Sequence, residues 1–131
     1  MSPRELVATF YERIWNAGDE TAAELILSPS LRFRGSLGVQ ATGPAEFTDY
    51  VRMVRASLAD YRCDIVETVH DGNRCFARMR FTGRHVAEFL GVPATGKTLS
   101  WEGAALFHCE QDLITDIWVL GDVEGLKEQM R

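Results

Sequence analysis

The pattern of hydrophobic positions changes near residue 61, from helical spacing to alternation. Before that point most apolar residues recur three or four positions apart, which is typical of amphipathic helices. From Tyr61 onward, apolar and polar residues alternate, as they do in strands with one buried face. Helices followed by a run of antiparallel strands indicate an α+β fold.

Three helices are predicted in the first half of the chain. The first begins at Ser2 with a Ser-x-x-Glu capping box and a proline at the first helical position, and it stops at Asn16-Ala17-Gly18. A short second helix runs from its cap at Asp19 to Ile26. The third opens at Thr42-Gly43-Pro44 and keeps helical spacing as far as Leu58.

The strands are predicted from period-two alternation and from the turn residues between them. A short strand at 31–34 is followed by a glycine-rich connection, and the chain ends in a short helical segment after residue 122. The four longer strands are expected at about 61–69, 74–83, 98–109 and 112–120.

The strand at 98–109 is largely apolar on both faces. One face carries Trp101 and Phe107, and the other carries Ala104 and Leu106 beside Glu102. A strand that is apolar on both faces is usually covered on both sides. The helices can cover only one of them, so we expect a second copy of the chain to cover the other, in a homodimer.

Composition and charge narrow the functional classes. The 131 residues fit one domain, residues 1–131, and the net charge of −5 arises from interspersed acids and bases. Nucleic-acid-binding proteins show clustered Lys and Arg, so we expect no nucleic-acid partner. No stretch approaches the roughly 20 apolar residues of a membrane helix, and residues 1–14 lack the pattern of a signal peptide. We therefore expect a cytoplasmic protein without a membrane partner.

The cysteines and histidines do not predict a metal site. The three cysteines match no Cys-x-x-Cys pattern, and the three histidines share no four-residue spacing. We expect reduced buried thiols, no metal and no cofactor. The residues considered are Cys63, Cys75, Cys109, His70, His85 and His108.

The segment from Gly91 to Thr98 matches the letters of a phosphate-binding loop, Gly-x-x-x-x-Gly-Lys-Ser/Thr. That loop must end at a helix N-terminus, whose backbone N–H groups hold the phosphates. Here Lys97-Thr98 leads into a predicted strand. We therefore interpret the segment as a turn that binds no nucleotide.

The same region carries a family resemblance. The segments Phe81–His85, Glu88–Lys97, Trp101–Gly103 and Ile114–Asp122 resemble the SnoaL-like polyketide cyclases of the nuclear transport factor 2-like superfamily. The resemblance implies a cone-shaped, curved antiparallel sheet wrapped around N-terminal helices. It also implies a deep pocket inside the cone and, commonly, a homodimer.

The cyclases of this family close a ring by intramolecular aldol chemistry without metal or cofactor. The resemblance implies that an Asp in the last strand moves the proton and that a His on the neighbouring strand assists. With the sequences aligned on Trp-x-x-x-Asp, these two positions fall on Val119 and Ala105. Aliphatic side chains cannot carry protons, so the family mechanism does not transfer to this chain.

Three other residues remain as candidates for catalytic proton transfer. Glu102 lies between apolar neighbours, where it is either a pocket acid or base, or the ion-pair partner of Arg78 or Arg80. Asp122 either faces the pocket or caps the last helix. His85 is either catalytic or held in a loop hydrogen bond.

Two hypotheses follow for function, with a third kept open. The chain is either a cofactor-independent cyclase, isomerase or lyase that acts on a hydrophobic carbonyl compound, or a non-catalytic module that binds a hydrophobic small molecule. Epoxide hydrolysis would need two acids and an arginine around one water. In each case the expected pocket residues are Trp15, Phe33, Trp101, Ala105, Trp118 and Val119.

Overall fold

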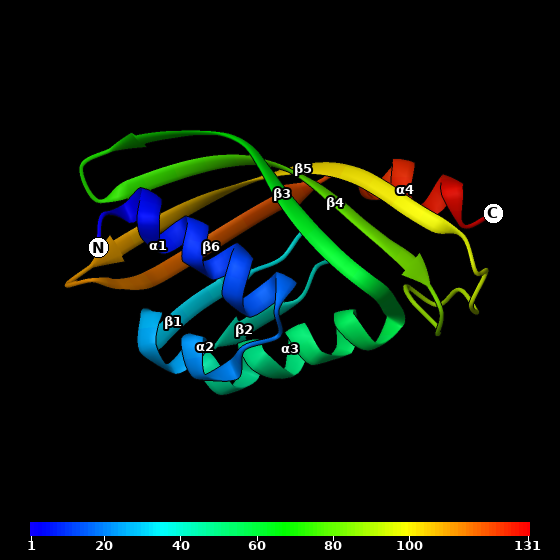
Figure 1. Cartoon of the computed structure of the whole chain (residues 1–131), viewed down its shortest axis with the longest axis horizontal. Helices are drawn as coiled ribbons and strands as arrows, with labels where there is room; N and C mark the ends of the chain where they lie inside the picture. The colour runs from blue at the N-terminus through cyan, green and yellow to red at the C-terminus, as the bar shows by residue number, and fades with distance from the viewer.

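A computed structural model describes all 131 residues as a curved six-stranded sheet (Figure 1). The helices before residue 58 pack on its concave face, and the C-terminal helix lies beside one strand at the end of the sheet. The helices are α1 (Pro3–Thr9), the π-helical η1 (Phe10–Asn16), α2 (Glu20–Ile26), α3 (Gly43–Ser57) and α4 (Val123–Gln129). The strands are β1 (Leu27–Arg34), β2 (Gln40–Thr42), β3 (Leu58–Asp71), β4 (Arg74–His85), β5 (Thr98–Glu110) and β6 (Leu113–Gly121). This is the α+β architecture expected from the sequence.

The sheet has the order β2-β1-β6-β5-β4-β3. The four long strands form an antiparallel meander, whereas β1 joins the last strand in parallel. The short β2 extends the sheet beyond β1. This order closes the first strand onto the last, so the sheet arches over α1, α2 and α3 (Figure 1).

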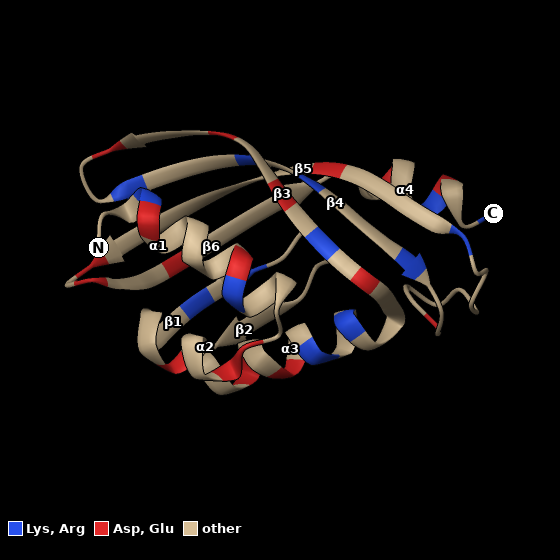
Figure 2. Cartoon of the chain, in the orientation of Figure 1, with Lys and Arg blue, Asp and Glu red and all other residues tan.

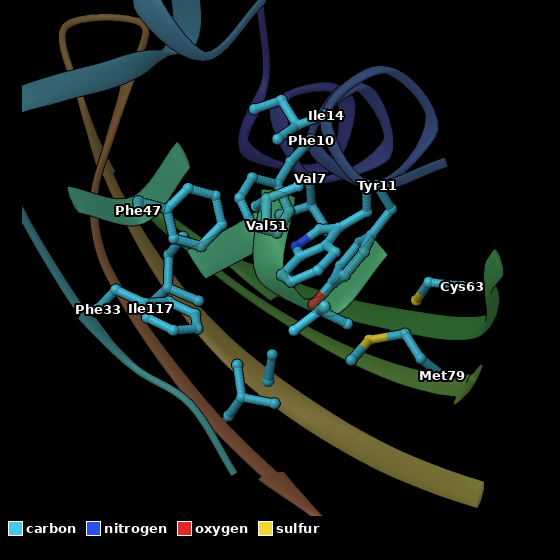
Figure 3. Close-up of a cluster of buried hydrophobic side chains, with 14 of the residues drawn as sticks. Val7, Phe10, Tyr11, Ile14, Phe33, Phe47, Val51, Cys63, Met79 and Ile117 are labelled. Atoms are coloured by element: carbon cyan, nitrogen blue, oxygen red, sulfur yellow. The ribbon is translucent and has the colours of Figure 1, made fainter. Parts of the chain in front are cut away.

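The hydrophobic core fills the space between the helices and the concave face of the sheet (Figure 3). Alternate residues of β4 face this core, from Cys75 to His85, and their neighbours are exposed apart from the half-buried Thr82. Phe10 packs against Phe47 of α3 and Phe107 of β5, with ring centroids 5.4 and 5.3 Å apart. Helix and sheet are therefore joined by aromatic contacts rather than by ion pairs.

The helix signals in the sequence are confirmed at their starts. The Ser2 hydroxyl accepts a hydrogen bond from the Glu5 backbone N–H at 3.2 Å, and the Glu5 carboxylate accepts one from the Ser2 N–H. Asp19 caps α2 through the N–H groups of Thr21 and Ala22. The structure differs in three places: the first helix ends in π-helical turns, β1 begins at residue 27, and β2 forms inside the predicted connection.

Charged residues are spread over the strands and helices without a region of one sign (Figure 2). Most arginines are paired with an acid, as in the 2.8 Å contact between Arg32 and Asp116. None of the helices combines the length and the apolar character that crossing a bilayer requires.

Candidate ligand cavity

An aromatic cavity lies between the helices and the concave face of the sheet. It has a volume of about 40 Å³, and nine of its fourteen lining residues are aromatic. We call these fourteen residues the cavity wall. They are Phe10, Tyr11, Trp15, Phe33, Gly35, Ser36, Leu37, Tyr50, Val54, Tyr61, Phe81, Phe89, Trp101 and Val119.

Helical spacing brings the helix residues of the wall onto one side. Tyr11 and Trp15 lie four positions apart on η1, as do Tyr50 and Val54 on α3, so each pair shares a helix face. Trp15 meets Tyr61 of β3 with ring centroids 5.2 Å apart. The wall therefore combines two helices with the facing strands of the sheet.

Two glycines make room for the rings of the wall. A Cβ on Gly103 would lie 2.6 Å from Cε2 of Phe81, so only glycine lets that ring lie across β5. There Phe81 stacks on Trp101 at a centroid distance of 5.3 Å. A Cβ on Gly35 would lie 3.0 Å from the Phe33 ring and 3.4 Å from the Tyr50 hydroxyl. These contacts fix the positions of four aromatic rings.

Three tyrosines supply the polar groups of the wall. Burial alone raises the pKa of Tyr50 to about 12, and burial is the main cause that raises the pKa of Tyr11 and of Tyr61 well above 10. None of the side-chain hydrogen bonds of the structure, such as those of Arg34, Arg55 and Asn16 near the cavity, involves a tyrosine hydroxyl. At neutral pH each is an uncharged hydrogen-bond donor that is free to meet a ligand.

These hydroxyls border the cavity and are not sealed in the core. The one side-chain nitrogen or oxygen that is sealed without a partner is Nε2 of His85. Figure 3 shows Tyr11 directed from its helix toward the sheet. The cavity thus offers hydroxyl donors within an otherwise apolar surface.

Four of the six expected pocket residues lie in the wall: Trp15, Phe33, Trp101 and Val119. Ala105 is completely buried in the core and does not reach the cavity. The prediction was wrong for Trp118, whose side chain is 49% exposed on the opposite face of the sheet, beneath the Arg34 guanidinium. Neighbours on a strand point to opposite faces, so Trp118 and Val119 cannot both face the cavity.

None of the three proton-transfer candidates lies in the wall. Glu102 is not a pocket acid or base, because its side chain is 60% exposed on the face opposite Trp101 and lies 3.9 Å from Arg80. Asp122 is exposed and caps α4, where its carboxylate accepts a hydrogen bond from the Gly125 N–H at 2.9 Å. Of the alternatives for these two residues, the geometry matches the ion pair for Glu102 and the helix cap for Asp122.

His85 is completely buried at the end of β4 and is held in a loop hydrogen bond. Its Nδ1 lies 3.0 Å from the Thr95 hydroxyl and accepts a bond from the Thr95 backbone N–H at 3.3 Å. The residue therefore ties down the segment that follows β4, and it is not part of the wall.

The sequence reasoning missed the tyrosines, Phe81, Phe89 and Leu37. Tyr11 could have been found, because it stands four residues before Trp15 on a predicted helix. Tyr61 and Phe81 come from different strands, and only the tertiary structure brings them to the same cavity.

The phosphate-loop letters do not form a phosphate site in this fold. The segment from Gly91 leads into β5 rather than into a helix, and Lys97 donates hydrogen bonds to the carbonyls of Gln129 and Arg131 near the C-terminus. No group of three His, Cys, Asp or Glu side chains lies close enough together to hold a metal ion.

The chain was compared with known protein families and with solved structures. The sequence profile of the SnoaL-like polyketide cyclases matches residues 5–130. A solved structure from Jannaschia sp. CCS1, assigned to the same group, superimposes with a TM-score of 0.89 at 16% identity, over 98% of this chain and 90% of that one. TsrD from Streptomyces laurentii superimposes with a TM-score of 0.85 at 27% identity, over 97% and 92% of the two chains.

A third structure carries a bound small molecule. A protein of ketosteroid isomerase-like fold from Catenulispora acidiphila, in complex with trimethylamine, has a TM-score of 0.82 at 14% identity, over 99% of this chain and 94% of that one. No curated protein sequence matches significantly. Since the family profile spans almost the whole chain and the structures share its fold, the chain belongs to the SnoaL-like polyketide cyclase family.

Proposed function

We propose that the chain binds a small hydrophobic carbonyl compound in the aromatic cavity, and that tyrosine hydroxyls hold its oxygen. The observation that carries the proposal is the presence of three unpartnered hydroxyl donors in a wall of aromatic rings. Flat apolar ligands favour aromatic surfaces, and a few placed donors fix their orientation. The complex of the C. acidiphila protein with trimethylamine supports the idea that this fold can hold a small organic molecule.

Binding without turnover is the form of this function that we favour. A general base must come within about 2.6–3.2 Å of the proton it removes. None of the fourteen wall residues carries a carboxylate, imidazole or amine. The positions that correspond to the cyclase Asp and His hold Val119 and Ala105. Epoxide hydrolysis has even less support, because it would need two acids and an arginine in this wall.

Catalysis by a cyclase, isomerase or lyase is the second candidate, and the neutral tyrosines favour it. Hydroxyl donors can stabilise the negative charge that develops on a carbonyl oxygen. The proton would then have to move to a base on the substrate itself, since the wall supplies none. Both candidates require the same hydrogen bond to the ligand.

The test uses a matched pair of probes, methyl naphthyl ketone and ethylnaphthalene, which differ in the carbonyl group. Titration followed by intrinsic fluorescence should show tighter binding of the ketone. Tyr50→Phe or Tyr61→Phe should remove most of that preference. The affinity for the ketone should fall by about tenfold, which corresponds to the loss of a hydrogen bond of about 1.4 kcal/mol. Trp118→Phe, outside the wall, is the control.

Three results would count against this proposal. Equal affinity for the two probes would show that the tyrosine hydroxyls do not contribute to ligand recognition. A ketone preference that survives Tyr→Phe changes at all three positions, 11, 50 and 61, would do the same. Chemical conversion of a carbonyl probe, detected by mass spectrometry and lost in the Tyr variants, would show that the chain is an enzyme rather than a non-catalytic binding module.

We further propose that the chain forms a homodimer through the convex face of its sheet. Apolar side chains lie there in register across three strands, since Phe76 pairs with Leu106 and Leu106 with Trp118. Phe76 and Trp118 are exposed, and Leu106 between them is half-buried. Leu120 extends this patch on β6. We call Phe76, Leu106, Trp118 and Leu120 the outer face.

A further inference from the structure

The cavity is too small for its proposed ligand while its wall stays in place. Its volume is about 40 Å³, whereas small-molecule pockets usually measure about 300–1,000 Å³. A two-ring ketone can enter only if part of the wall moves. The strands and helices of the wall are fixed by the core, so the segments to consider are the two loops.

One of these loops, residues 86–97, is tied to the rest of the protein. The Val86 N–H donates to the Ser57 carbonyl at 3.0 Å, and the Ser57 hydroxyl donates to the Glu88 carbonyl at 2.9 Å. Thr95 is bound to His85. We call this segment, which brings Phe89 to the wall, the anchored loop. Moving it would break bonds at both of its ends.

The other loop, residues 35–39 between β1 and β2, makes its backbone hydrogen bonds only within itself. Its hydrogen bonds run from the Gly35 N–H to the Val39 carbonyl and from the Gly38 N–H to the Gly35 carbonyl. Gly38 has a φ of +84°, a conformation that glycine adopts freely. Between the two glycines, Leu37 is half-buried and lies in the cavity wall. This loop can swing outward without losing a bond to another element.

We propose that residues 35–39 are the gate of the cavity and that Leu37 is the side chain that closes it. The gate moves as one unit because its two hydrogen bonds are internal. Leu37 then limits the size of the ligand, since the space it vacates is added to the cavity. This inference rests on the proposed function, in which the cavity is the ligand site, but the movement of the gate can be measured without any ligand.

The measurement uses a thiol placed inside the cavity. Val54→Cys puts a similar-sized reactive group in the wall, 3% exposed in the closed structure. Iodoacetamide can reach that thiol only when the cavity opens, so its labelling rate follows the open population. Peptide mapping by mass spectrometry separates this site from the three native cysteines, all of which are buried.

A disulfide can lock the gate in the same chain. A Cβ built on Gly121 would lie 3.4 Å from the Cβ of Ser36, close to the range of about 3.5–4.5 Å in disulfides. In Val54→Cys chains, the oxidised Ser36→Cys/Gly121→Cys pair should slow labelling at position 54 by about tenfold or more. Ser36→Cys without the second cysteine is the matched control, and reduction of the disulfide should restore the rate.

Two more variants compare the loops. Leu37→Ala should speed labelling at position 54 several-fold, because the side chain that closes the cavity is shortened. Thr95→Ala, which loosens the anchored loop without touching the wall, should leave the rate unchanged. An unchanged rate in the cross-linked chain would overturn the gate. So would an effect of Thr95→Ala as large as that of Leu37→Ala.

The gate and the proposed function fail in different ways. If the cross-link slows labelling but neither naphthalene probe binds the uncross-linked protein, the gate stands and the ligand proposal falls. If the ketone binds the cross-linked, oxidised chain as fast as the reduced chain, the ligand proposal stands and residues 35–39 are not the gate.

Discussion

At the scale of single residues, the tyrosines distinguish this site from ordinary core packing. The chain contains three tyrosines, and all three lie in the cavity wall. A tyrosine in a core usually has a hydrogen-bond partner for its hydroxyl. Here burial raises the pKa of each phenol, and none of the hydroxyls makes a hydrogen bond within the chain. Since no tyrosine lies elsewhere, the ultraviolet absorbance of tyrosinate reports on the cavity alone.

This gives a prediction for alkaline pH. A phenol with a raised folded-state pKa adds stability below its unfolded pKa of about 10, and that stability is lost as the pH rises toward its folded value, about 12 for Tyr50. Spectrophotometric titration of the folded chain should therefore show almost no tyrosinate at pH 10. The urea-unfolded chain should be half ionised there. Half ionisation of even one tyrosine at pH 10 in the folded chain would contradict its burial.

Gly103 is the second residue on which the shape of the wall depends. Gly103→Ala places a methyl group where the Phe81 ring now lies, at 2.6 Å. We expect a loss of about 1–3 kcal/mol in the free energy of unfolding, as for other overpacked cores. Urea denaturation measures the loss. Adding Phe81→Leu should recover part of it, and no recovery would show that the strain lies elsewhere.

At the scale of elements, local signals predicted the helices and their caps, because a cap depends on residues three positions apart. The alternation of β3 to β6 was likewise visible in the sequence. The parallel pairing of β1 with β6 was not predicted, because it joins residues about 85 positions apart, such as Arg32 and Asp116. The three-residue β2 is too short to show a period, and its place depends on pairing with β1.

The candidate site shows the same division between local and distant signals. Four expected wall residues were found from their size and apolar character. Trp118 was misplaced because alternation was not applied strictly within β6. Glu102 was misjudged because apolar sequence neighbours do not bury a side chain that points to the other face of the sheet. The tyrosines could be grouped only once the strands were arranged in space.

Asp122 provides a prediction for helix α4. Asp122→Ala removes the cap on the Gly125 N–H and should cost about 1 kcal/mol of unfolding free energy, whereas Asp122→Asn should keep most of it. Neither change should alter the affinity for methyl naphthyl ketone. A large loss of ketone binding in a folded Asp122→Asn chain would show that Asp122 belongs to the ligand site.

At the scale of the whole molecule, the concave face of the sheet is covered by helices and the outer face is not. The outer face presents large apolar side chains in adjacent rows, including Trp118 at 49% and Leu120 at 53% exposure. An apolar patch of this kind is typical of a surface that binds another protein.

The expected assembly is a dimer that buries the outer face. Light scattering at micromolar concentration should give twice the mass of the 14.7 kDa chain. A specific interface of this kind should bury on the order of 1,000 Å² or more. Trp118→Glu/Leu120→Glu should yield folded monomers, and Val66→Glu, elsewhere on the exposed sheet, is the control. A monomeric wild-type chain would contradict the assembly.

The most direct test of the account is the infrared spectrum of bound methyl naphthyl ketone, isotopically labelled at its carbonyl. A hydrogen bond weakens the C=O bond and lowers its stretching frequency. We expect a bound-state band below the frequency in cyclohexane, shifted back toward that value in Tyr50→Phe or Tyr61→Phe chains that still bind the probe. A bound ketone with its cyclohexane frequency in the wild-type cavity would show that no tyrosine donates to it, and would contradict the account.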